Sequence, residues 1–143
     1  RMPRPLLDRM EVIRIPGYTE DEKSESAKRH LMPKVQKDTG LRKGEWTVAD
    51  DAVRDLIRYY SREAGVRNLE RELANLARKS LKEIATTDQT AITVTAENLG
   101  DSAGVRKLRY GEIEDEALVG VVTCFASTEV CGELMQVEDV FMP

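Results

Sequence analysis

Histidine and cysteine are scarce in this chain, which limits the sites that it can build. The 143 residues include one histidine, His30, and two cysteines, Cys124 and Cys131. Two cysteines are too few for a disulfide framework, and they cannot complete a four-ligand zinc site without nearby histidines. We therefore expect free thiols, a surface histidine and no bound metal.

Long apolar runs are also missing. No stretch of eighteen apolar residues occurs, and the opening "RMPRPLLDRM" lacks the apolar region of a signal peptide. With 41% hydrophobic and 34% charged residues, the composition is that of an ordinary globular domain. The sequence thus predicts a folded cytoplasmic protein with no membrane partner.

Basic residues are absent from the last part of the chain. Residues 111–143 contain eight acids and no Lys or Arg, so the remaining 110 residues carry 22 bases against 18 acids. The first part reads as helical, and the second as short β-segments with many Val, Thr and Gly. This change places a domain boundary in the acidic stretch "GEIEDEA".

Three helices can be predicted from caps and apolar spacing. Thr19 and Glu22 have capping-box spacing, which starts a helix over about 20–37, and Pro33 should bend or divide it. Asp50 should cap a second helix that ends at Gly65. The third spans about five turns, and its apolar face comprises Leu69, Leu73, Leu76, Ala77, Leu81 and Ile84.

Short strands complete the predicted fold. "EWTV" and "ITV" (92–94) are each followed by a capping residue, the second by Thr95 at the start of another helix, so two strands should pair beside the bundle. "MEVIRI" (10–15) alternates like a further strand. The predicted class is mainly α: a helical bundle with a short two-stranded parallel sheet, followed by a partial β-rich segment.

The stretch "SREAGVRNLERELANL" interrupts good helical sequence at Gly65 and restarts it with Arg67 in the first turn. A cation there opposes the helix dipole unless an anion lies between them, so Arg67 could contact a phosphate. Alternatively, Arg67 pairs with Glu63 or Glu70 and the glycine only connects two packed helices. Arg9, beside Asp8, is read from the residues alone as part of a local salt bridge.

Several segments together resemble a known family. "RPLLDRMEVIRIPGYTEDEK", "KRHLMPK" and "YYSREAGVRNLERELANLARK", with "VGVVT", "STEV" and "GEL" near the end, resemble in order and spacing the Lon family of bacterial ATP-dependent proteases. The resemblance implies an internal piece of such a protease. Residues 1–16 would end the AAA+ ATPase core, 17–107 would form its small helical (lid) subdomain, and 108–143 would be acidic linker and the incomplete start of the serine protease domain.

The resemblance also implies roles for two arginines. Arg67 matches the sensor-2 position, which contacts nucleotide phosphate within its own subunit, and Arg9 matches the arginine finger, which reaches the nucleotide of a neighbouring subunit. The whole protein would be a homohexameric serine endopeptidase of protein quality control and the stress response. It would use ATP and Mg to degrade misfolded, unfolded and regulatory proteins. The P-loop and the catalytic Ser and Lys lie outside these residues, so we expect no catalytic residue, bound cofactor or activity in this segment alone.

The chain departs from the family pattern near its end and in its first helix. Cys124, Phe125, Ser127 and Cys131 stand where glycine, leucine, tryptophan and glycine are usual, and Ser24 and Ser26 replace usually apolar residues. If the usual glycines adopt positive φ, cysteine would strain the backbone there.

Two other classes of function fit parts of the sequence. The basic body, with candidate DNA contacts on the third helix, would suit a DNA-binding module; these contacts are Arg71, Arg78, Lys79 and Lys82. The acids Glu70, Glu72 and Glu83 dilute that face. A non-enzymatic interaction domain is the other class, and it would not respond to nucleotide.

Overall fold

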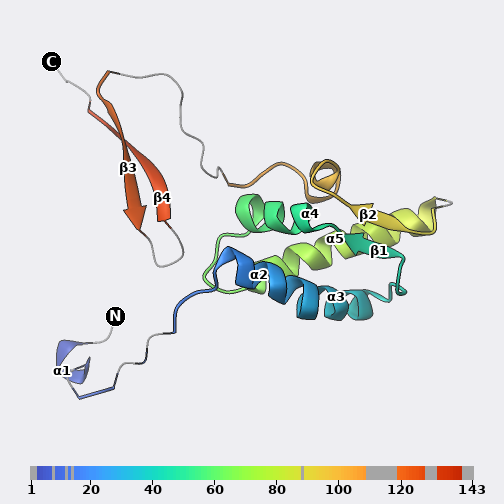
Figure 1. The fold of residues 1–143 in the computed structure, drawn as a ribbon, viewed down its shortest axis with the longest axis horizontal. Helices are drawn as coiled ribbons and strands as arrows, with labels where there is room; N and C mark the ends of the chain where they lie inside the picture. The colour runs from blue at the N-terminus through green and yellow to red at the C-terminus, as the bar shows by residue number, and fades with distance from the viewer. Residues whose placement is uncertain are drawn as a thin grey trace.

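The chain is mainly helical, with β-structure at the end, as the sequence predicts (Figure 1). The computed structural model describes residues 3–7, 9–11, 13, 15–87, 89–108, 119–127 and 132–139. The helical elements are α1 (Arg4–Leu7), α2 (Glu20–Ser26), η1 (Ala27–Leu31), α3 (Met32–Thr39), α4 (Asp50–Asp55), η2 (Leu56–Tyr60), α5 (Arg67–Thr86) and α6 (Leu99–Ala103). The strands are β1 (Trp46–Val48), β2 (Ile92–Val94), β3 (Val121–Ser127) and β4 (Gly132–Glu138).

The predicted capping box starts α2. Glu22 N donates to Thr19 Oγ1 at 3.3 Å, and Thr19 N donates to Glu22 Oε2 at 2.8 Å. The Glu22 carboxylate accepts from both Thr19 N and Thr19 Oγ1, and these two hydrogen bonds hold the pKa of Glu22 below its usual range. The chain then continues through the π-helical turn η1 into α3, whose second residue is Pro33. Pro33 does not divide the helical stretch as expected, because the backbone stays helical from α2 through η1 into α3 and the missing N–H is accommodated directly after the wide turn.

Both predicted ends of the second helix need correction. Ala49, in extended conformation, occupies the N-cap position, and Asp50 is the first helical residue. The helix does not reach Gly65: Ser61 leaves it in an extended conformation, with Ser61 N donating to Leu56 O at 3.0 Å. The π-helical turn η2 therefore closes the helix at Tyr60, five residues earlier than expected.

Helix α5 supplies the centre of the core. Leu69, Leu73, Leu76 and Ala77 are at most 1% exposed, and buried side chains of η1, α3, α4 and η2 belong to the same core. Leu81 lies outside this face, at 36% exposed, contrary to prediction, because the elements covering the start of α5 do not extend over it. Ile84 is half-buried.

The two short strands pair as predicted. β1 and β2 run parallel with Trp46 opposite Ile92 and Val48 opposite Val94. Thr95 does not cap the next helix: α6 begins four residues later at Leu99, and Thr95 N instead donates to the Asn98 side chain at 2.7 Å. That bond closes a turn between the strand and α6.

The predicted strand over 10–15 is absent at the described residues. Met10, Glu11, Ile13 and Ile15 are not in a strand, and Val12 and Arg14 lie outside the described residues. Ile13 and Ile15 are 79% and 88% exposed. A strand needs a partner for its backbone N–H and C=O groups, and no described segment pairs with these residues.

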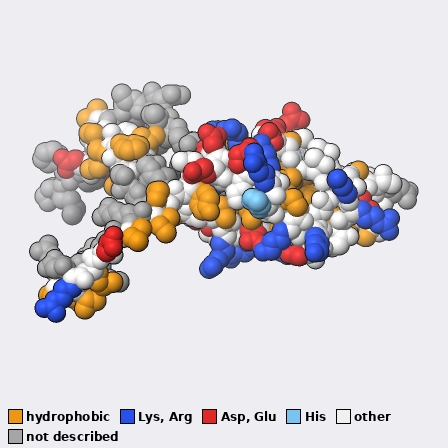
Figure 2. All heavy atoms as spheres, turned by 60° about the horizontal axis from the view of Figure 1, so that its bottom comes forward, with side chains coloured by type: hydrophobic (Ala, Val, Ile, Leu, Met, Phe, Trp, Pro, Cys, Tyr) orange, Lys and Arg blue, Asp and Glu red, His pale blue; other side chains and the backbone are white. Residues whose placement is uncertain are grey.

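The β-segment near the end is an antiparallel hairpin of β3 and β4. Both of its faces expose apolar side chains, among them Phe125 and Val137, and hydrophobic atoms gather at the surface on this side of the molecule (Figure 2). Cys124 is a free thiol in β3, and no described non-glycine residue has positive φ, so the expected strain is absent at Cys124. Cys131 and the boundary stretch 111–117 lie outside the described residues.

Candidate functional site

Arg67 is the first residue of α5, and the segment 61–66 that precedes it is not helical. Its side chain is exposed. Among the described residues, the guanidinium makes no hydrogen bond or ion pair. A charged fork of five N–H donors thus projects from the helix start toward solvent.

The orphan N–H groups of α5 are capped by Glu63, not by an external anion. Asn68 N donates to Glu63 Oε2 at 2.9 Å, and Leu69 N donates to Glu63 Oε1 at 2.8 Å. Both carboxylate oxygens are therefore engaged with backbone, and the negative charge sits where the helix dipole favours it. The carboxylate also offsets the unfavourable placement of a cation at this end of the helix.

The other acid that could pair with Arg67 has a different partner. Glu70 Oε1 accepts from Lys34 Nζ at 2.7 Å, across the boundary between α3 and α5. This hydrogen bond and the carboxylate charge raise the pKa of Lys34. Neither Glu63 nor Glu70 therefore forms an ion pair with Arg67. The structure thus does not show the pairing with these acids that the sequence left open as an alternative.

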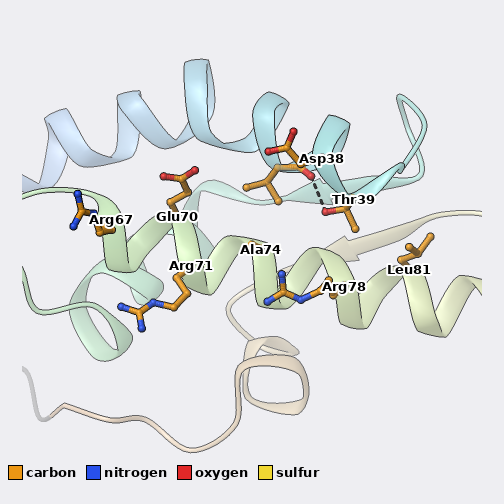
Figure 3. Close-up of a pocket in the computed structure, with 9 residues that line it drawn as sticks. Asp38, Thr39, Arg67, Glu70, Arg71, Ala74, Arg78 and Leu81 are labelled. Atoms are coloured by element: carbon orange, nitrogen blue, oxygen red, sulfur yellow. Dashed lines mark hydrogen bonds between the residues drawn. The ribbon is translucent and has the colours of Figure 1, made fainter.

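Arg67 lies at one end of a groove between α3 and α5 (Figure 3). The groove has a volume of about 620 Å³, and Asp38 and Thr39 of α3 face the side chains of α5 across it. Three arginines of α5 line it: Arg67, Arg71 and Arg78. Asp38 and Glu70 are its acids. Such a groove suits an anionic ligand at the arginine-rich side, where Arg67 has free donors.

The four candidate DNA contacts lie exposed on α5. Arg71 donates to the Asn68 side chain at 2.5 Å, Arg78 donates to that of Asn75, and Lys79 donates to Ser102 O. A second hollow, of about 400 Å³, is lined by Arg78, Lys79 and Lys82 together with Lys107. The fold thus adds one lysine from beyond α6 to the basic face.

Arg9 lies in the turn that follows α1 and is exposed. α1 lies apart from the helical body in Figure 1, and the structure does not bring Arg9 to Arg67. Asp8 lies outside the described residues, so the predicted local salt bridge is not described. The two arginines do not form one site within this chain.

The described part of the chain contains no cluster of three or more His, Cys, Asp or Glu side chains that could hold a metal ion. None of its helices is both long enough and apolar enough to cross a bilayer.

Two family models match the chain. The Lon protease AAA+ ATPase lid domain matches residues 37–94, and the Lon protease (S16) C-terminal proteolytic domain matches residues 93–143. The solved structure of the Bacillus subtilis Lon protease SSD domain is 52% identical, with a TM-score of 0.55. The match covers 66% of this chain and 99% of that one. The chain belongs to the Lon protease family.

Curated relatives extend the similarity over the whole chain. The Lon protease of Azospirillum brasilense is 59% identical over 145 residues, and that of Brucella suis is 57% identical over 142. These matches cover 100% and 99% of this chain, and it spans 18% of the length of each relative.

The Lon lid match includes the whole of the 61–66 segment and Arg67, whereas Arg9 lies before it. The C-terminal match includes both strands of the hairpin. The domain boundaries at 16–17 and 107–108 remain predictions.

Sequence analysis missed two residues that shape the start of α5 in this Lon segment. Glu63 was considered only as an ion-pair partner, because the usual capping residues stand at the N-cap itself, which is Val66 here, and Glu63 lies three residues before it. Lys23 was not considered. Nothing in the sequence distinguishes Lys23 from a solvated lysine, and only the fold shows that it is 6% exposed.

Proposed function

We propose that this chain is the nucleotide-responsive lid of an ATP-dependent serine protease, and that Arg67 acts as its sensor-2 residue. Bound ATP would supply a phosphoanhydride bond whose cleavage develops negative charge on the γ-phosphoryl oxygens. Arg67 holds a permanently charged planar donor toward those oxygens. Movement of the lid on this contact couples hydrolysis to the pulling of misfolded or regulatory proteins into a proteolytic chamber.

The observation that carries the proposal is the pairing pattern around Arg67. Both nearby acids are engaged elsewhere, Glu63 with backbone amides and Glu70 with Lys34, while the guanidinium is exposed without a partner among the described residues. An unpaired arginine at a capped helix start fits a phosphate ligand. By the family resemblance, the residues that coordinate Mg lie in other parts of the whole protein.

In the same proposal, Arg9 contacts the nucleotide that is bound to a neighbouring subunit. Arg9 is exposed and separate from Arg67, which suits an arginine finger acting in trans within a hexameric ring of identical subunits. The P-loop, the catalytic serine and lysine and the remaining substrate contacts belong to the rest of the protein. We place the whole assembly in the cytoplasm, in protein quality control and the stress response.

The full-length protein should hydrolyse ATP and degrade an unfolded protein such as casein only while ATP is hydrolysed, and the present chain alone should do neither. A paired assay of phosphate release and casein degradation tests both statements. Degradation at the same rate without nucleotide would contradict the proposal and favour an interaction domain that does not respond to ATP.

A second candidate function is weak DNA binding by α5. Two of the three acids that dilute its basic face are paired with lysines brought by the fold, Glu70 with Lys34 and Glu72 with Lys107 at 2.6 Å. The exposed arginines and lysines of α5 thus remain as a basic stripe. Such a stripe binds phosphate backbones without reading sequence.

Replacing Arg71 and Arg78 by alanine together should weaken duplex binding and flatten its salt dependence. Each lost phosphate contact changes the slope of log K against log salt by about 0.9, so the slope should fall in magnitude by about 2. Fluorescence anisotropy of a labelled duplex across a salt series measures this. The matched control is the Arg42→Ala, Lys43→Ala pair in the turn before β1, and equal slopes for both pairs would exclude α5 as the binding face.

A further inference from the structure

We infer that Lys23 is a positioning residue for Arg67: its buried ammonium holds the 61–66 segment from which α5 and Arg67 emerge. The inference rests on the proposed function of Arg67 and extends it to a residue that contacts no nucleotide. It starts from an exception to normal burial. Lysine is rarely buried unless its charge is paired, yet Lys23 in α2 is 6% exposed.

The ammonium has a specific acceptor. Lys23 Nζ donates to the backbone carbonyl of Glu63, forty residues away in the sequence. A charge-assisted hydrogen bond in a nearly dry site is strong, because the ammonium has few water molecules to replace that carbonyl. Lys23 therefore fixes the backbone of the residue whose side chain caps α5.

The next carbonyl of the segment, that of Ala64, is bonded by the residues just before α2. Tyr18 N donates to Ala64 O at 2.8 Å. At Gly17, a Cβ atom would lie 3.1 Å from both Cβ and O of Ala64, so the close approach of the two backbones depends on glycine. We call Gly17, Tyr18 and Lys23 the clamp. It holds two successive carbonyls of the 61–66 segment.

A chain of contacts then leads from the clamp to Arg67. The clamp fixes the backbone of Glu63 and Ala64. The Glu63 carboxylate in turn accepts from the amides of Asn68 and Leu69. Arg67, the first helical residue, lies in the chain between these two fixed points. Without the clamp, the 61–66 segment is no longer anchored to α2, and the backbone position of Arg67 is no longer fixed. A displacement of about 1 Å in a group that acts on a transition state can cost about 100-fold in rate.

The clamp itself can be tested in this chain without nucleotide. Lys23→Met keeps most of the buried stem but removes the donor and leaves the Glu63 carbonyl unsatisfied. Amide exchange at Tyr18, Asn68 and Leu69 should become about tenfold faster, while amides in the middle of α5 keep their protection. The matched control is Lys28→Met, one turn further along the same helical stretch, where the lysine pairs with Asp50 at 2.8 Å.

A second variant loosens the clamp from its other side. Gly17→Ala places a methyl group against Ala64 and should raise exchange at the same amides, which keeps the test decisive should Lys23→Met fail to fold. Exchange at these three amides that matches Lys28→Met in both variants would overturn the inference.

The link to Arg67 is tested in the full-length protease by a double-mutant cycle. Lys23→Met should lower kcat for ATP hydrolysis by about 10- to 100-fold. Adding it to Arg67→Ala should lower kcat no further, because both changes remove the same contact, that of Arg67 with phosphate. Fully multiplicative losses would overturn the positioning role. Faster exchange combined with full activity of Arg67→Ala would instead show that the proposed function fails while the clamp exists.

Discussion

Arg67→Ala in the full-length protease is expected to fold normally and to lose about 10²- to 10³-fold of its ATP-driven protein degradation. The stability should change little, because the side chain is exposed and has no described partner to lose. The rate should fall because one transition-state donor is missing. Degradation of a folded substrate and thermal unfolding of the same preparation measure both effects.

Arg42→Ala is the matched control, since Arg42 lies just before β1, does not line the groove, is exposed and pairs only weakly with Glu45, at 3.9 Å. It should retain nearly full degradation. Cleavage of a short unstructured peptide by Arg67→Ala should suffer less than cleavage of a folded protein, because the peptide needs less mechanical pulling. If Arg67→Ala instead melts several degrees lower and keeps full ATPase activity per folded molecule, Arg67 is a structural residue.

Leu73→Ala should destabilise the helical body by about 2–5 kcal/mol. Leu73 is fully buried on α5, so its truncation removes apolar burial and leaves a cavity in the core that α5 shares with η1, α3, α4 and η2. Domains of this size are stable by only about 5–15 kcal/mol, so the loss is a large share of the total. Urea unfolding followed by the single tryptophan, Trp46, which is 4% exposed, reports on this core directly.

Leu81→Ala on the same helix is the control, because Leu81 is 36% exposed and its loss should cost less than about 1 kcal/mol. Equal losses at Leu73 and Leu81 would mean that α5 is not packed as described. A gradual rather than cooperative transition would show that the helical body does not fold as one unit.

The regular elements of the helical body were predictable because local sequence specifies them. The Thr19 and Glu22 capping box, most of the apolar spacing of α5 and the two short strands appear in the structure. The caps expected after the strands, Asp50 and Thr95, do not. Their ends were less predictable. The π-helical turn η2 ends at Tyr60, where Ser61 N donates to Leu56 O. No residue type at this point of the sequence signals that the helix ends there.

The candidate site was predictable only in part. Arg67 stands out because a cation begins a helix, and that oddity is local. Its freedom from Glu70 depends on Lys34, thirty-six residues away, and its anchoring depends on Lys23, which is forty residues from Glu63. The strand expected at 10–15 failed for the same reason: alternation can be read locally, but a pairing partner cannot.

The central claim is that Arg67 acts on the phosphate of bound ATP, and single-turnover hydrolysis at saturating ATP tests it most directly. This measurement isolates the chemical step from nucleotide binding and from substrate pulling. The account predicts that Arg67→Ala binds ATP but hydrolyses it about 10²- to 10³-fold more slowly than the unaltered protease, whereas Arg42→Ala hydrolyses it normally. Equal single-turnover rates in all three proteins would contradict it.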